Sequence, residues 1–161
     1  MTTHAEGIST MDSDTMKIRP PALAGMVLLA ALGLNFLVPA IRVFHWPHHF
    51  LAMLVVAAGT AIMVSAASIF NALGTTKNPY GEPATFIRLR PYTFTRNPMY
   101  LGLTMVLLGL ALYVGSMPMF LAPLAFFFVI DRMVIPREEA TMERTFGANY
   151  TDYKARVRRW L

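Results

Sequence analysis

The sequence contains no cysteine, and only 14% of its residues are charged. Without cysteine the chain has no disulfide, no thiolate nucleophile and no cysteine-based metal site. It also lacks any Gly-x-Gly, which excludes the glycine-rich turn of Rossmann-type nucleotide-binding domains. By contrast, 55% of its 161 residues are hydrophobic, whereas soluble domains average about 45–50%. This excess of apolar residues indicates a membrane protein with a single domain.

Four apolar stretches are long enough to be considered as membrane-spanning helices. Each approaches or exceeds the ~20 residues that cross ~30 Å of hydrocarbon. Only Gly115 and Ser116 separate the last two stretches, which predicts a tight antiparallel hairpin. We therefore predict an all-α, polytopic membrane protein with about four transmembrane helices, at residues 20–41, 49–73, 98–114 and 117–135. Residues 1–19 are polar and are expected to form a disordered cytoplasmic tail, which leaves residues 20–161 as one membrane domain.

Basic residues gather on one side of the predicted spans. Of the 14 Lys and Arg residues, only Arg42 falls between the first and second spans. Because basic residues accumulate on the cytoplasmic side, we expect both termini and the loop of residues 74–97 to be cytoplasmic. The formal charge of +5 then indicates contact with anionic membrane lipids rather than with nucleic acid. Residues 146–161 are basic and aromatic, which predicts an amphipathic helical tail on the cytoplasmic surface.

Two short polar blocks lie beside the ends of the predicted hairpin. The first is residues 90–100, Arg-Pro-Tyr-Thr-Phe-Thr-Arg-Asn-Pro-Met-Tyr, and the second is residues 136–139, Pro-Arg-Glu-Glu. Charged side chains at a membrane boundary are unfavourable unless they are solvated or serve a function. Because the predicted topology puts both blocks on the cytoplasmic side, we expect them to meet in one site at the membrane face.

Each block also has an interpretation that needs no ligand. Asn97 and Pro98 are typical of a helix start, where Asn caps the helix, although free N–H groups there also suit an anionic ligand. Glu138 and Glu139 follow a proline, which predicts a second helix start whose dipole the carboxylates stabilise. The loop of residues 74–97 fits both a segment packed at the membrane interface and a lid over a site. Taken separately, the two blocks leave these alternatives open.

The ordered set of motifs resembles a known family. It consists of Arg-Asn-Pro-Met-Tyr-Leu-Gly at residues 96–102, Arg-Glu-Glu at 137–139, Phe-Gly-x-x-Tyr-x-x-Tyr-Lys at 146–154 and Val-Arg-Arg-Trp at 157–160. In this order the motifs resemble the integral-membrane isoprenylcysteine carboxyl methyltransferases and phospholipid methyltransferases. The short bacterial members are more similar still, since Gly-Thr-Thr-Lys-Asn-Pro at residues 74–79 also matches them. The resemblance implies an integral protein of the bacterial inner membrane.

The resemblance also implies S-adenosylmethionine as the methyl donor, bound at the cytoplasmic ends of the last two spans. The family's Arg-His-Pro-x-Tyr motif maps onto Arg96, Asn97, Pro98 and Tyr100, with Asn97 in place of His, and its Glu-Glu pair maps onto residues 138–139. The predicted donor-binding residues are Tyr92, Arg96, Asn97, Pro98, Tyr100, Leu101, Gly102, Glu138, Glu139 and Tyr150. The predicted catalytic residues are Arg96, Arg137 and Glu138.

The residue types suit methyl transfer. A carboxylate of Glu138 or Glu139 can pair with the donor's ammonium group or accept hydrogen bonds from its ribose. A tyrosine ring can stack on adenine or face the sulfonium, a contact of about 0.5–2 kcal/mol. Arg96 or Arg137 can bind a carboxylate of the donor or of an acidic acceptor with two parallel hydrogen bonds. We expect a lipophilic acceptor, either an isoprenylcysteine-like carboxylate or a lipid head group, that enters from the bilayer.

A non-enzymatic membrane protein is the alternative, either a four-helix scaffold or a small transporter subunit. Transport would favour acidic residues in mid-span, but the nearest is Asp131 at the end of the fourth span. No metal ion is predicted, because His45, His48 and His49 have no carboxylate or cysteine nearby in the sequence. The sequence names neither the acceptor nor the oligomeric state.

Overall fold

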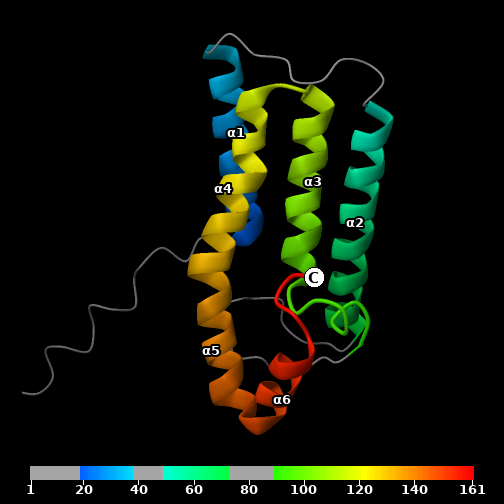
Figure 1. Cartoon of the computed structure of the whole chain (residues 1–161), viewed down its shortest axis with the longest axis vertical. Coiled ribbons are helices and arrows are strands. Elements are labelled where there is room, and N and C mark those ends of the chain that lie inside the picture. The colour runs from blue at the N-terminus through cyan, green and yellow to red at the C-terminus, as the bar shows by residue number, and fades with distance from the viewer. Residues whose placement is uncertain (1–18, 38–48, 73–88) are drawn as a thin grey trace, which may run out of the picture.

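The computed structural model describes residues 19–37, 49–72 and 89–161, which form a bundle of helices (Figure 1). In chain order the elements are α1 (Pro20–Leu37), α2 (His49–Ala72), α3 (Pro98–Val114), the 3₁₀ turn η1 (Met117–Phe120), α4 (Leu121–Val129), the π-helical turn η2 (Ile130–Val134), α5 (Ile135–Phe146) and α6 (Ala148–Arg156). The all-α prediction is therefore confirmed. The predicted tail up to residue 18 and the loop residues 74–88 lie outside the described residues.

Three helical segments are long and apolar enough to cross a membrane. They are Pro20–Leu37, His49–Ile69 and the continuous helix Met117–Phe146. α3 begins and ends where the sequence predicted, but it has only 17 residues, which span about 26 Å. A fourth crossing by α3 therefore stays a prediction. Gly115 ends α3 with a left-handed backbone conformation (φ 70°), which lets the chain reverse into the hairpin as predicted.

The last span continues further than the sequence predicted. Pro136 was expected to start a new helix, and it does lie in the first turn of α5, but α5 follows α4 and η2 without a break, so Met117–Phe146 is one helical run of 30 residues. In η2 the N–H of Ile135 donates to the carbonyl of Ile130, five residues back, so the regular α-helical ladder is already interrupted there. Pro136, which has no N–H to donate, follows this wider turn without breaking the helix. Thirty residues extend about 45 Å, so α5 projects beyond ~30 Å of hydrocarbon.

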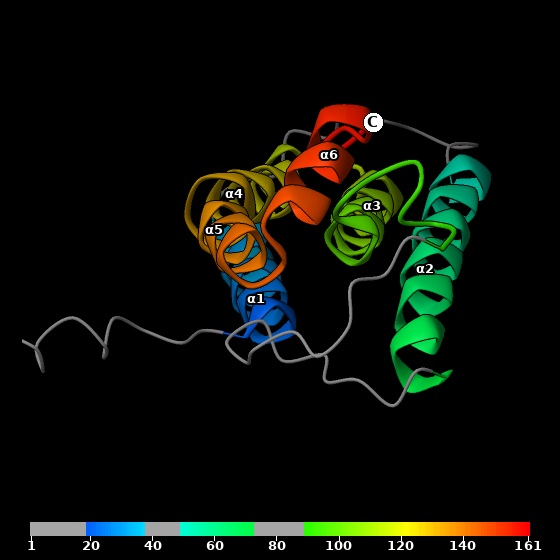
Figure 2. The same ribbon diagram turned by 90° about the horizontal axis from the view of Figure 1, so that it is seen from below.

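Small residues let α2 and α3 pack backbone against backbone. A Cβ atom added at Gly102 would lie 2.5 Å from the carbonyl oxygen of Gly59, and one added at Gly59 would lie 2.6 Å from the carbonyl oxygen of Gly102. A Cβ atom added at Gly109, two turns further along α3, would lie 2.5 Å from Cγ2 of Val56 and 2.9 Å from its backbone nitrogen. Such contacts between small residues are how helices associate in lipid, where no hydrophobic effect drives them together. α3 is thereby held between α2 and α4 (Figure 2).

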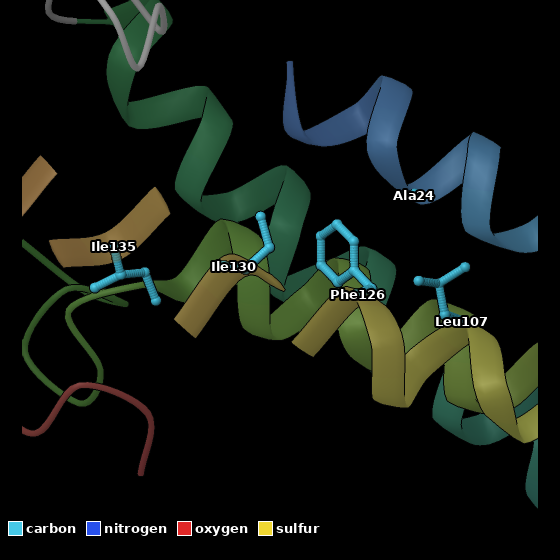
Figure 3. Packing of buried hydrophobic residues seen from close by; sticks show 5 residues of the cluster. All are labelled: Ala24, Leu107, Phe126, Ile130 and Ile135. Carbon is cyan, nitrogen blue, oxygen red and sulfur yellow. The ribbon is translucent and has the colours of Figure 1, made fainter. Parts of the chain in front are cut away.

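The core lies between α1, α3 and the long helix, and the outer faces of the bundle are apolar. Ala24, Leu107, Phe126, Ile130 and Ile135 form a buried cluster along the interior (Figure 3). Many large apolar side chains on the outside are exposed instead, which suits contact with lipid rather than water. Because α3 starts and α5 ends at the same end of the bundle, the hairpin brings the two polar blocks together (Figure 1).

Candidate functional site

A buried carboxylate, Glu139 on α5, is the centre of an ion-pair network at this end of the bundle. Its residue is 6% exposed. Nη1 of Arg96 lies 3.1 Å from Oε1 of Glu139, Nη2 of Arg159 lies 2.9 Å from Oε2, and Nζ of Lys154 lies 3.5 Å from Oε2. Nε of Arg159 also donates to Oε1 at 3.2 Å. Glu139 therefore joins the start of α3, α6 and the C-terminal residues to α5.

Arg96 is enclosed in this network, and its side chain is only 10% exposed. Nη1 lies within ion-pair distance of Glu139, but the direction of its N–H bonds does not make a hydrogen bond, and the buried Nε has no hydrogen-bond partner among the described residues. A buried donor without an acceptor is unfavourable by about 1–3 kcal/mol. The Nε–H of Arg96 is therefore a buried donor for which the described residues supply no acceptor.

Two tyrosines of α6 line the same region. Tyr150 and Tyr153 are buried, and burial, the largest cause, raises the pKa of each hydroxyl to about 12. The nearby Glu139 also raises the pKa of Tyr150, while the guanidinium of Arg96 acts in the opposite direction. Both phenols stay neutral at physiological pH. Tyr153 donates a 2.6 Å hydrogen bond to the carbonyl oxygen of Tyr92, which fixes α6 to the loop before α3.

Glu138, the neighbour of Glu139, has a different environment. It is half-buried, and its Oε1 accepts a 2.5 Å hydrogen bond from the hydroxyl of Tyr100 on α3. The ring of Tyr92 is close enough for the negative charge of Glu138 to raise the pKa of that phenol further, although burial is the main cause. Among the described residues no cation pairs with Glu138, whereas Asp131, Glu139 and Glu143 each pair with at least one.

After α6 the C-terminal residues turn back toward the start of α3 (Figure 1). Nη1 of Arg159 lies 3.3 Å from Oδ1 of Asp131 in the π turn, and the indole N–H of Trp160 donates to the same oxygen at 2.9 Å. The Trp160 ring packs on Phe127, with the ring centroids 4.7 Å apart. Arg132 forms a more exposed pair with Asp131 at 3.4 Å. Asp131 thus pairs with its neighbour Arg132 and also holds the C-terminal residues Arg159 and Trp160.

The main chain of the C-terminal residues is bound as well. The N–H of Arg96 donates to the carbonyl of Arg158 at 3.0 Å. The carbonyl of Arg159 accepts two hydrogen bonds, from the hydroxyl of Thr95 at 3.1 Å and from Nδ2 of Asn97 at 3.0 Å. Asn97 precedes the first residue of α3 as predicted, but its side chain does not cap the helix. The prediction of a capping role was wrong because the amide bonds the C-terminal segment instead.

The structure brings most of the predicted site residues together but gives some of them other surroundings. Pro98 is buried at the first position of α3, directly after the network. Gly102 faces α2, so helix packing already explains a glycine there, and Leu101 beside it is half-buried. Arg137 is exposed and takes part in none of the ion pairs among the described residues. Roles in binding or catalysis for these residues stay predictions.

Sequence reasoning missed several members of the network. Thr95, Lys154 and Arg159 were not predicted as site residues, and Asp131 was noted only as an acidic residue at the end of the fourth span. An acidic residue at the end of an apolar span was the signal for Asp131. The basic and aromatic C-terminus was interpreted as a helix on the membrane surface. Its last residues instead make defined contacts across the site.

The chain is similar to known proteins over more than half of its length. Residues 47–149, more than half of the chain, match the family described as phospholipid methyltransferase. The chain belongs to the phospholipid methyltransferase family. A protein of Haemophilus influenzae described as uncharacterized is 43% identical over 63 residues, which are 39% of this chain and 100% of that relative. No solved structure matches the chain.

This family is a group of membrane methyltransferases, as the sequence motifs predicted. The matched residues include both polar blocks and therefore the contacts between Arg96 and Glu139 and between Tyr100 and Glu138. The match ends at residue 149, before Tyr150 and before Arg159. The C-terminal part of the network is thus contributed by residues outside the matched range.

Proposed function

We propose that the protein transfers a methyl group from S-adenosylmethionine to a lipophilic acceptor at the cytoplasmic face of a bacterial inner membrane. The donor binds where the start of α3 meets α5 and α6. Family membership supports the methyltransferase activity, and the distribution of basic residues supports the orientation with both termini in the cytoplasm. Residues 20–161 then act as one membrane domain with four spans, α3 being the shortest.

The observation that carries the proposal is the environment of Glu138. The donor is a cation at its sulfonium and at its ammonium group, so it needs a carboxylate that is not already neutralised. Glu139 is close to three cations, Arg96, Lys154 and Arg159, and its charge is fully compensated. Glu138 is held only by the neutral hydroxyl of Tyr100 at 2.5 Å among the described residues. A cation beside Glu138 favours the ionised form of this half-buried carboxyl group and is attracted to it.

Other groups around the site fit the remaining parts of the donor. The buried Nε of Arg96 lacks a hydrogen-bond acceptor, which a carboxylate of the donor would provide. The phenols of Tyr92 and Tyr150 are neutral, and such rings can stack on adenine or face the sulfonium. The donor supplies an electrophilic methyl group, and the task of these residues is to orient it and exclude water.

The acceptor side uses the residues nearest to lipid. Arg137 is exposed on α5, next to Glu138 in the sequence, and a guanidinium there suits an acceptor carboxylate or a phosphate of a lipid head group. α4 leads to this position with exposed apolar side chains such as Leu124 and Phe128, which are 53% and 55% exposed. An acceptor with an apolar tail can therefore keep its tail in lipid while its head reaches the site.

Calorimetric titration of the purified protein in detergent with S-adenosylhomocysteine tests the donor site. We expect Glu138→Gln to raise the Kd about 10- to 100-fold, because a hydrogen-bonded charge is lost. Asp152→Asn is the matched control, since Asp152 is an exposed acid on α6, and its Kd should stay within about twofold of the wild-type value. Equal affinity of the wild type and Glu138→Gln would remove Glu138 from the donor site. No binding to the wild type would favour a scaffold or transporter subunit.

A further inference from the structure

The last five residues, 157–161, form a segment that we call the C-terminal strap. It leaves α6 at Val157, whose backbone is extended (φ −114°, ψ 129°), and crosses to the start of α3. Its contacts combine main-chain hydrogen bonds to the loop before α3 with side-chain bonds to the long helix. The strap therefore links three parts of the chain that are far apart in the sequence.

Arg159 is the residue at which these two kinds of contact meet. Its carbonyl oxygen accepts from Thr95 and Asn97, so both of its lone pairs are used. Its guanidinium spans two carboxylates, Glu139 at 2.9 Å and Asp131 at 3.3 Å. Hydrogen bonding to Glu139 is the main reason why the pKa of Arg159 is raised. The hydrogen bonds to the carbonyl of Arg159 fix its backbone, and the position of the backbone sets where its guanidinium lies.

We propose that Asn97 is a positioning residue that acts on the donor site through the strap and does not touch the donor. Its amide N–H holds the carbonyl of Arg159, which keeps the Arg159 guanidinium across Glu139. With Glu139 neutralised in this way, Glu138 remains the carboxylate that attracts the donor cation. The effect on the donor rests on the proposed function, whereas the docking of the strap does not.

Three observations favour this role over direct contact with the donor. The amide of Asn97 is already engaged at 3.0 Å and does not cap α3. Its backbone N–H is engaged as well, because it donates a hydrogen bond to the hydroxyl of Thr95 at 3.2 Å. Thr95 is 2% exposed, so the junction of loop and strap is a closed unit. A side chain at position 97 needs one N–H donor for this role, and an imidazole can supply it as an amide does.

The tryptophan of the strap provides a measurement that needs neither donor nor activity. The chain has two tryptophans, so Trp46→Phe leaves Trp160 as the single reporter. Trp160 is bonded to Asp131 and packed on Phe127, and release of the strap would move its emission to longer wavelength. In this background we expect the red shift for Asn97→Ala, near wild-type emission for Asn97→His, and no change for the exposed control Thr93→Ala.

A double-mutant cycle on donor affinity separates positioning from contact. We expect Asn97→Ala to raise the Kd for S-adenosylhomocysteine about 3- to 10-fold, the effect of one lost hydrogen bond. In an Arg159→Ala background the same change should have less than about a twofold effect, because the guanidinium that Asn97 positions is gone. Additive effects of the two substitutions would overturn the proposal and show direct contact.

The Trp160 emission measurement tests the proposal even if the double-mutant cycle cannot be carried out. Should Asn97→Ala not fold, Thr95→Val removes the other donor to the Arg159 carbonyl at nearly constant volume and should give the same red shift. Unchanged Trp160 emission in both variants, with normal donor binding by the wild type, would overturn the strap proposal. Failure of the wild type to bind S-adenosylhomocysteine would instead overturn the proposed function, while a red shift in Asn97→Ala would still support the strap.

Discussion

The hydroxyl of Tyr100 on α3 donates a 2.5 Å hydrogen bond to Glu138 on α5, although 38 residues separate them in the sequence. The contact exists because α3 leaves the site and the helix Met117–Phe146 returns to it. The continuous helix through η2 extends far enough for Glu138 to reach the level of Tyr100. The hairpin thus joins one residue from each polar block.

Removal of this hydroxyl should weaken donor binding without unfolding the protein. In Tyr100→Phe the carboxylate of Glu138 loses its only hydrogen bond from the described residues and is free to turn away from the donor cation. We expect the Kd for S-adenosylhomocysteine to rise about 3- to 30-fold. Tyr113→Phe, at the other end of α3, keeps the ring that packs on His49 and should bind like the wild type. Calorimetric titration of both variants checks this, and equal affinities would argue against a role for the hydroxyl.

The sequence predicted those parts of the fold that depend on local signals. Asn97 and Pro98 before an apolar run, and Gly115 after it, marked both ends of α3 correctly. Pro136 lies in the first turn of α5 as predicted, but no local motif marked the π turn that joins α5 to α4. The predicted likeness to methyltransferases was confirmed by the family match. The order of motifs along the chain can be recognised without knowing how the helices pack.

The network at the site was predictable only in part. The meeting of the two polar blocks followed from topology, and the pair of Arg96 with Glu139 bears it out. The different environments of Glu138 and Glu139 could not be inferred from their adjacent positions in the sequence. They arise because the two side chains contact different partners in the folded chain. Arg159 reaches carboxylates 20 and 28 residues away, and such contacts depend on how the chain turns after α6.

Loss of the central carboxylate should destabilise the protein more than loss of a peripheral one. Glu139→Gln leaves Arg96, Lys154 and Arg159 without their shared partner in a buried position, and we expect a loss of about 3 kcal/mol in the free energy of unfolding. Glu143→Gln removes only the ion pair with Lys154, in which the side chain of Lys154 is 37% exposed and that of Glu143 is 42% exposed. We expect this variant to lose less than about 1 kcal/mol in the free energy of unfolding. Equilibrium unfolding in mixed detergent micelles compares the two. Similar losses would mean that the Glu139 network contributes little to stability.

A methyl group added between α2 and α3 should also destabilise the bundle. In Gly102→Ala the new Cβ would lie 2.5 Å from the carbonyl oxygen of Gly59, so the two backbones must move apart. We expect a loss of about 1–3 kcal/mol in the free energy of unfolding. Gly25→Ala is the matched control on α1, because no atom lies within 4 Å of its added Cβ, and it should be neutral or stabilising by up to ~1 kcal/mol. A stable Gly102→Ala would show that the helices can separate freely.

The orientation in the membrane can be measured with single cysteines, since the natural chain has none. Met117, at the hairpin, is 57% exposed, and Thr93, in the loop before α3, is exposed as well. Because 13 of the 14 basic residues lie outside the sequence between the first two predicted spans, we expect the side of Thr93 to be cytoplasmic. An impermeant maleimide should label Met117→Cys in intact spheroplasts and Thr93→Cys only after lysis. The reverse pattern would invert the proposed topology.

The acceptor should be a small polar head on an apolar tail. The proposed donor site lies where the start of α3 meets the first turns of α5, and exposed apolar residues of α4 lead to it from the apolar part of the bundle. Incubation of the protein with methyl-labelled donor and a total membrane lipid extract should therefore put label into the organic phase. If the head is anionic, Arg137→Lys should lower this rate about 10-fold, because a point ammonium cannot make the paired hydrogen bonds of a guanidinium. Arg144→Lys, also exposed on α5 but two turns further from the membrane, is the control and should not change the rate. Label that stays in the aqueous phase with soluble acceptors would contradict a lipophilic substrate and leave the methyltransferase activity in place.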